Sequence, residues 1–215
     1  MSSTILSIET SSTICSTAII DNHEILNCCE ELCPREHNER LPRLVKKTFD
    51  KSNKTINNID AIAVSIGPGS FTGLRIGLGF SKGIAFSRGL PIIPVPTMLS
   101  LAYSLKDSEP KNGILFSHSE KVFFQCFEWQ NNIPIVKDKV VVTNIESIME
   151  KEKLDFHSNC EKFLGNNVAI KAANHSAIHI ARLASKFYNE WIIETPHDLV
   201  PDYIAPFEIK NSAKK

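Results

Sequence analysis

A glycine-rich run between residues 67 and 79 has the composition of a phosphate-binding loop. It follows the apolar, strand-like segment 61–66 and leads into a helical pattern that ends near Gly89. Backbone N–H groups at such a helix start would suit an anion. However, no Gly-Lys-Ser/Thr sequence follows, and the glycine spacing does not fit a dinucleotide-binding fingerprint. These mismatches exclude a Walker A loop and favour a structural use of the glycines.

The small residues of this run recur at helical spacing. One helix face carries Gly69, Gly73, Gly77 and Ser81, and a neighbouring face carries Gly79 and Gly83. Each interior glycine costs a helix about 1 kcal/mol relative to alanine, so close approach of another backbone is the expected compensation. That backbone belongs either to the chain's own domain, which the residues alone favour, or to a helix of another protein.

The other reactive side chains form no recognisable catalytic or metal site. His175 and His179 are four residues apart in a predicted helix, but no third ligand is evident nearby. No Gly-x-Ser-x-Gly nucleophile motif is present. The cysteines form no Cys-x-x-Cys pair, and we expect reduced thiols. We therefore predict no metal site and no catalytic residues in this chain.

The chain divides into two halves with the same predicted order of elements. Strands are expected at 4–9, 14–21, 24–32, 61–66 and 91–95, with helices at 37–52, 70–88 and 97–105. After a polar stretch at 107–113, strands are expected at 114–116, 122–128, 133–142 and 163–165, with helices at 145–153 and 175–189. Asn38 and either Ser70 or Thr72 are candidate helix N-caps.

These elements predict a subdomain at 1–106, a smaller one at 107–205, and a disordered tail at 206–215. Three meandering strands followed by β-α-β-α give an α/β, ribonuclease-H-like unit. Lys plus Arg equals Asp plus Glu at 24 each, which argues against a stand-alone nucleic-acid binder. No signal peptide or membrane span is recognisable, so we expect a cytoplasmic protein without membrane contact.

Three segments resemble one protein family. The run Gly-Pro-Gly-Ser-Phe-Thr-Gly-Leu-Arg-Ile-Gly at 67–77 resembles the signature of the TsaB (YeaZ) family. Residues 31–37 and 5–11 are similar to the segment before that family's first helix and to its first strand. The resemblance is high over residues 1 to about 100 and faint beyond. It implies two ribonuclease-H-like subdomains of the actin, sugar kinase and Hsp70 (ASKHA) superfamily, the second one reduced.

The resemblance also implies a function. Members of the family are accessory subunits, not enzymes by themselves, in the synthesis of threonylcarbamoyladenosine in tRNA. The chain would bind and activate the catalytic paralogue TsaD, and the ATPase TsaE would be the third member of the complex. It would contact tRNA indirectly, through the complex, and would form a homodimer when alone. The implied interface lies on the first two helices and comprises Leu41, Leu44, Val45, Phe71, Gly73, Leu74, Gly77, Leu78 and Ser81. Accordingly, we expect Gly77→Leu to fold but to lose TsaD binding.

Nucleotide binding is implied only weakly. Superfamily members that bind nucleotide place Mg²⁺ with a carboxylate after the first strand, followed by glycines that admit phosphate. Here Glu9 stands where aspartate is usual, and no glycine follows. We expect no tightly bound cofactor, and ATP or ADP with Mg²⁺ only in the assembled complex. Weak nucleotide or tRNA contacts are assigned to Glu9, Thr10, Arg35 and Arg40.

Several positions depart from the family pattern. The paralogue TsaD binds its metal through a His-x-x-x-His pair, but Leu41 stands four residues after His37, which we expect to be a cap or surface residue. Ser117–Glu120 and Ala205 replace polar positions of relatives. The alternative is a stand-alone ATP-dependent phosphotransferase or divergent peptidase whose turnover would depend on Glu9.

Overall fold

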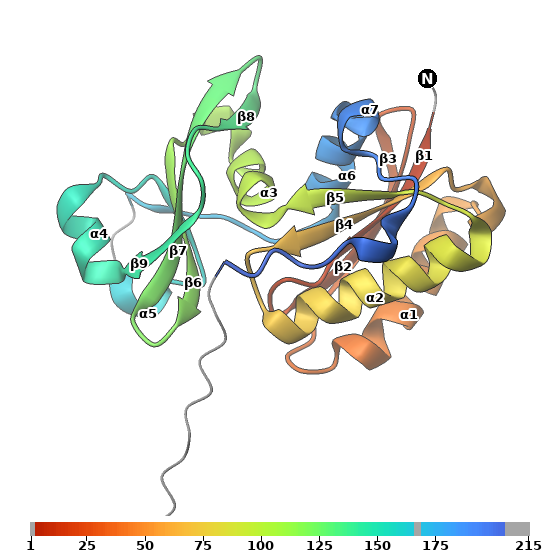
Figure 1. Ribbon diagram of the computed structural model, residues 1–215, viewed down its shortest axis with the longest axis horizontal. Helices are drawn as coiled ribbons and strands as arrows, with labels where there is room; N and C mark the ends of the chain where they lie inside the picture. The colour runs from red at the N-terminus through yellow and green to blue at the C-terminus, as the bar shows by residue number, and fades with distance from the viewer. Residues whose placement is uncertain (1–2, 166–168, 205–215) are drawn as a thin grey trace, which may run out of the picture.

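The computed structural model describes residues 3–165 and 169–204 and shows two mixed sheets flanked by helices (Figure 1). The two sheets lie side by side along the long axis, with helix α3 (Thr97–Ser104) between them. The predicted disordered tail, 206–215, lies outside the described residues, as does Ala205.

The first sheet has the strand order β3-β2-β1-β4-β5. Its strands are β1 (Thr4–Glu9), β2 (Ile14–Asp21), β3 (Glu24–Leu32), β4 (Ala61–Gly67) and β5 (Ile92–Pro96). The first three strands are antiparallel, whereas β4 is parallel to both β1 and β5. Helices α1 (His37–Ser52) and α2 (Phe71–Arg88) make the crossovers and cover one face of this sheet.

The second sheet repeats this order, with shorter strands at both of its edges. It runs β11-β10-β6-β7-β8, and β9 also pairs with β7. Its strands are β6 (Asn112–His118), β7 (Lys121–Gln130), β8 (Ile133–Val136), β9 (Val141–Asn144), β10 (Phe156–Ser158) and β11 (Lys171–Ala172). Because β6 pairs antiparallel with β7 and parallel with β10, it is the counterpart of β1. The predicted fold of two ribonuclease-H-like units, the second reduced, is confirmed.

Helices α1 and α2 form for reasons that the sequence makes visible. Leu41, Leu44 and Val45 of α1 are buried at helical spacing against the first sheet. Ser70 caps α2, because its hydroxyl accepts a hydrogen bond from the Gly73 N–H at 3.2 Å. The predicted Asn38 cap is wrong: α1 begins at His37, and the Glu36 carbonyl accepts from the N–H groups of Glu39 and Arg40.

Several short elements differ from the prediction. The expected strand at 163–165 is the end of helix α5 (Glu161–Leu164), and the strand is β10 instead. The expected strand 133–142 is two strands, since a polar stretch interrupts it. The helix expected at 175–189 is divided into α6 (Ala177–Lys186) and α7 (Tyr188–Trp191). Helix α4 (Ile145–Lys151) lies where a helix was expected.

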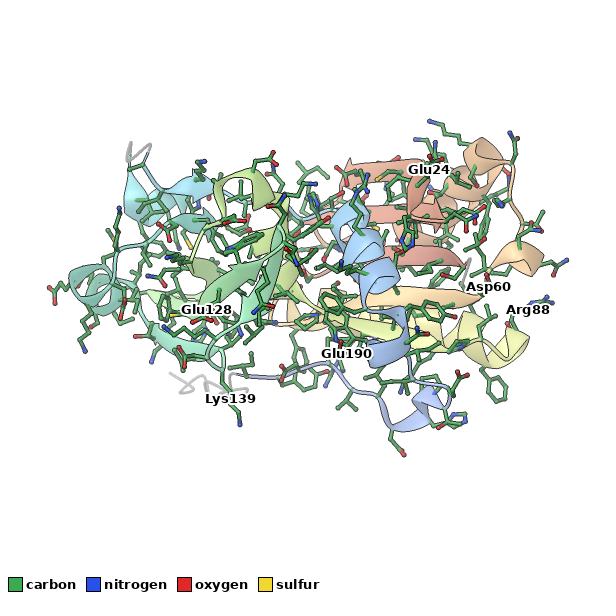
Figure 2. All side chains as sticks on the ribbon, turned by 90° about the horizontal axis from the view of Figure 1, so that it is seen from above. Glu24, Asp60, Arg88, Glu128, Lys139 and Glu190 are labelled. Carbon is green, nitrogen blue, oxygen red and sulfur yellow. The ribbon has the colours of Figure 1, made fainter. Side chains whose placement is uncertain are left out.

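The predicted subdomain boundary needs one correction. A boundary near residue 107 separates the two sheets, but α6 returns to the first sheet and packs against β1 and β2. Figure 2 shows α6 crossing above the strands of the first sheet near the middle of the molecule. Helix α3, from the first half, contacts β6 and β8 of the second. Each half therefore contributes a helix to the other, and residues 177–191 belong to the first sheet by packing.

This exchange produces a single apolar cluster across both sheets. Ile5 and Val95 of the first sheet share it with Phe123 and Phe156 of the second, and with α6 residues such as Leu183. The second face of each sheet has its own cluster, under α1 and α2 in one case and under α4 and α5 in the other. The two subdomains are thus joined by buried apolar surface.

Candidate functional site

The turn between β1 and β2 packs tightly against the start of α2. The Ser70 N–H donates to the Ser11 carbonyl at 2.7 Å, and the Thr10 hydroxyl donates to the Gly73 carbonyl at 2.8 Å. A Cβ atom on Gly73 would overlap the Thr10 carbonyl, and one on Gly77 would overlap the Thr10 hydroxyl. The inner glycines therefore allow α2 to approach the chain's own β1 turn.

Most residues predicted to contact a partner lie in the core instead. Phe71 is half-buried, and the other eight are buried beneath α1 and α2: Leu41, Leu44, Val45, Gly73, Leu74, Gly77, Leu78 and Ser81. The expectation that Gly77→Leu folds is corrected for the same reason, since its side chain has no room. Periodicity revealed the stripe but not that it faces the chain's own sheet.

The outer face of α2 offers a different surface. Gly79 and Gly83 are exposed, and a Cβ atom on either would meet nothing within 4 Å. Phe86, one turn further along, is 81% exposed. Ile76 and Phe80 are half-buried beside them. This set, which we call the outer α2 face (Ile76, Gly79, Phe80, Gly83 and Phe86), combines open backbone with apolar side chains.

A cleft of about 1060 Å³ lies between the two subdomains. The start of α2, the β1–β2 turn and the β6–β7 turn form its walls, and residues 202–204 lie at it as well. Its lining includes Ser11, Ser12, Arg35, Ser70, Phe71 and Ser117. Of the four residues assigned to weak nucleotide or tRNA contacts, Arg35 lines the cleft, whereas Glu9, Thr10 and Arg40 do not.

Glu9 is turned away from the cleft into a buried polar cluster. Its Oε1 accepts from the Ser11 N–H at 2.5 Å and lies 3.8 Å from Nδ1 of His175. Burial raises the pKa of Glu9, but the nearby imidazole of His175 and the hydrogen bond from Ser11 outweigh it, so this pKa lies below its usual value. Glu9 is held as a carboxylate by protein groups.

His175 joins this cluster to the second subdomain. Its Nδ1 lies 3.1 Å from Oγ of Ser11, and its Nε2 lies 3.0 Å from Oγ of Ser158, the last residue of β10. All four side chains are buried. A serine, a histidine and a carboxylate are therefore in contact, but the Ser158 hydroxyl, in a residue only 2% exposed, does not line the cleft. This arrangement suits fixed packing better than attack on a substrate.

The remaining candidate side chains are mostly engaged in structure. Contrary to expectation, His37 is buried, and its Nε2 lies 3.2 Å from the Ile14 carbonyl. Arg40 pairs with Glu36 at 2.9 Å, and Lys46 pairs with Asp50 at 2.7 Å, as on a solvated helix face. Within residues 3–165 and 169–204, no three His, Cys, Asp or Glu side chains are grouped to hold a metal ion.

The last described segment ties α2 to the cleft. Residues 192–204 run from the edge of β5, where Ile193 and Ile92 exchange backbone hydrogen bonds, past α2. The Arg75 Nε–H donates to the Tyr203 hydroxyl at 2.8 Å, and its guanidinium lies 3.8 Å from the centre of the Phe71 ring. The Asp202 N–H donates to the Ile66 carbonyl. The sequence did not predict this arrangement.

Comparison with known proteins decides the family. A family model described as TsaD, tRNA N6-adenosine threonylcarbamoyltransferase, matches residues 29–122. The tRNA threonylcarbamoyladenosine biosynthesis protein TsaB of Escherichia coli (strain K12) is 42% identical over 98 residues, 46% of this chain and 42% of that protein. TsaB of Buchnera aphidicola subsp. Acyrthosiphon pisum is 30% identical over 154 residues, 71% of this chain and 67% of the relative. The chain belongs to the TsaB family.

A solved structure agrees with this assignment along most of the chain. A Pseudomonas aeruginosa protein described as similar to the peptidase YEAZ superposes with a TM-score of 0.82 at 25% identity. The match covers 94% of this TsaB family member and 100% of that protein. Against three TsaB relatives, the chain spans about half of their length, with 42%, 52% and 58% covered. None of the helices within the described ranges is long and apolar enough to cross a membrane.

Proposed function

We propose that this chain is a non-catalytic subunit in the synthesis of threonylcarbamoyladenosine in tRNA, where it binds and activates a TsaD catalytic subunit. The observation that carries the proposal is the sequence likeness to TsaB relatives. A family model for TsaD also matches residues 29–122. This range contains both α1 and α2. Two paralogues that share these helices can pair them about a pseudo-two-fold axis.

The outer α2 face is the surface on which we place TsaD. Open space above Gly79 and Gly83 lets a second helix approach the α2 backbone closely. The exposed ring of Phe86 would then be buried, at about 25 cal/mol per Å² of apolar surface removed from water. The buried residues Leu44, Leu74 and Leu78 support the helices from below.

Other parts of the assembly follow from the same family likeness. TsaE completes the complex, tRNA is met through the complex, and the free chain forms a homodimer by the same helices. The chain works in the cytoplasm. Any ATP or ADP with Mg²⁺ is held in the assembled complex, near the cleft that Arg35 lines. Because Glu9 is engaged by Ser11 and His175, it is not free to place a metal ion.

The test is binding of TsaD by a variant of the outer α2 face. Gly83→Leu adds a side chain where the structure has open space, so the protein should fold while its affinity for TsaD falls at least tenfold. Lys139→Leu places an exposed leucine on the second subdomain instead (Figure 2), and this variant should bind as the unchanged chain does. Calorimetric titration with TsaD from the same cell measures both.

Three results would count against the proposal. Unchanged affinity in Gly83→Leu would contradict the surface chosen. Failure of the unchanged chain to bind TsaD would contradict the function itself. Turnover of ATP or peptide by the isolated chain, lost in Glu9→Gln, would favour a stand-alone phosphotransferase or peptidase instead.

A further inference from the structure

The β1–β2 turn is held from two opposite sides. On one side it meets α2, through the Ser70 N–H on the Ser11 carbonyl and the Thr10 hydroxyl on the Gly73 carbonyl. On the other side Ser11 and Glu9 meet His175. Since Gly69 and Gly73 leave no space for a Cβ atom against this turn, a displacement of the turn must displace the start of α2.

His175 is itself held between the two subdomains. Toward the second sheet, its Nε2 meets the hydroxyl of Ser158, which pairs with Leu115 of β6 in the sheet. Toward the first sheet, the two residues after it are anchored: Ser176 donates to Glu30 at 2.6 Å, and the Ala177 N–H donates to Ser16 at 2.9 Å. The imidazole therefore has partners in both subdomains.

The side chains that connect Ser158 to α2 are buried and in direct contact with one another. Ser158, His175 and Ser11 are 2%, 6% and 2% exposed, so water does not readily replace a lost bond. A buried polar group left without its partner is costly, which favours concerted movement over breaking the chain at one link. The contacts form one path: Ser158 to His175, His175 to Ser11, and Ser11 to Ser70.

We infer that His175 is a positioning residue that couples the second subdomain to the first turn of α2. A shift of β10 is passed through the Ser158 hydroxyl and the imidazole to the β1–β2 turn, and from there to Ser70 and Gly73. The consequence for TsaD binding rests on the proposed function, whereas the coupling within the isolated chain does not.

Ser158→Ala tests the coupling far from α2. It removes one hydroxyl on the second subdomain and leaves every atom of α2 unchanged. Amide hydrogen exchange at Ser70 and Gly73 should become about tenfold faster, as loss of one buried hydrogen bond implies. Exchange at Arg88 and Gly89, at the other end of α2, should not change. Ser104→Ala removes a hydroxyl that donates to the nearby Leu101 carbonyl in the same helix, and it is the matched control.

A second variant and a binding measurement complete the test of the coupling. If Ser158→Ala does not fold, His175→Gln keeps an amide toward Ser158, loses the contact with Ser11, and should give the same local change. Unchanged exchange at Ser70 and Gly73 in the variant that folds would overturn the inference. If the unchanged chain binds TsaD, Ser158→Ala should weaken this binding about tenfold. If it does not bind TsaD, the proposed function fails, and the exchange result still decides the coupling.

Discussion

At the scale of single residues, two glycines of one helix have opposite surroundings. Gly77 faces the Thr10 hydroxyl, which is engaged with the Gly73 carbonyl, whereas Gly83 faces open space. The two positions are six residues apart on α2, so they point in different directions from its axis. One glycine is required by packing inside the chain, and the other is available to a partner.

Substitutions at these glycines should change stability in opposite directions. Gly77→Ala should lower the free energy of unfolding by about 3 kcal/mol, since its methyl group overlaps Thr10. Gly83→Ala should raise it by about 1 kcal/mol, because alanine is the better helix former and the added methyl meets no atom. Urea denaturation of both variants measures the difference. Equal effects of the same sign would contradict the packing described for α2.

Glu9 should make the free energy of unfolding decrease at acidic pH. Its pKa is lower in the folded chain than in the unfolded chain, so its contribution is fully present above its ordinary pKa of 4.5 and is lost as the pH falls through the folded value. His175→Gln removes the contacts made at Nδ1 that hold this pKa down, so the folded and unfolded pKa values move closer together and the stability that Glu9 loses in acid should become smaller. Urea denaturation between about pH 3 and about pH 7 measures it.

A matched control separates Glu9 from the other acids. Glu24→Gln changes an exposed carboxylate at the far end of the first sheet (Figure 2) and should leave the acid limb of the profile unaltered. If Glu9→Gln also left that limb unaltered, the buried cluster would not be the source of the acid dependence.

At the scale of elements, the length of a helix or strand and the period of its apolar residues determined whether the sequence could predict it. The apolar stripe of α1 runs from Leu41 to Phe49, and Ser70 before a glycine-rich helix is a recognisable start, so the sequence predicted both helices. β10 has three residues and α5 has four, too few for either period to show. Phe163 was therefore assigned to a strand, although it lies in a helical turn.

The site was less accessible to sequence than the helices. The glycine stripe predicted close backbone approach, but periodicity cannot tell the chain's own turn from a partner's helix. Ser11 and His175 are separated by 164 residues, and their contact depends on how α6 returns to the first sheet. Glu30 and Ser16, which hold the residues after His175, show no motif in the sequence. Only tertiary packing reveals these contacts.

At the scale of the whole molecule, the shared apolar cluster predicts that the two subdomains unfold together. Trp129 in β7 and Trp191 in α7 both pack against this cluster. Trp129 belongs to the second sheet, whereas α7 packs against β5 of the first sheet. The variants Trp129→Phe and Trp191→Phe each leave one tryptophan as a reporter. Their fluorescence transitions in urea should have the same midpoint, matching that of circular dichroism. Separate midpoints would show that the subdomains unfold independently.

The return of α6 to the first sheet also determines the order of events during translation. Ile5, Ala63 and Ile93 lie on the face that α6 covers, so this apolar face stays open while the ribosome makes the second subdomain. The nascent first half is then a sheet protected by α1 and α2 on one side only, which is a surface that chaperones bind and that aggregates. Completion of residues 177–186 closes it, so the first half becomes fully native only after the second subdomain has been made.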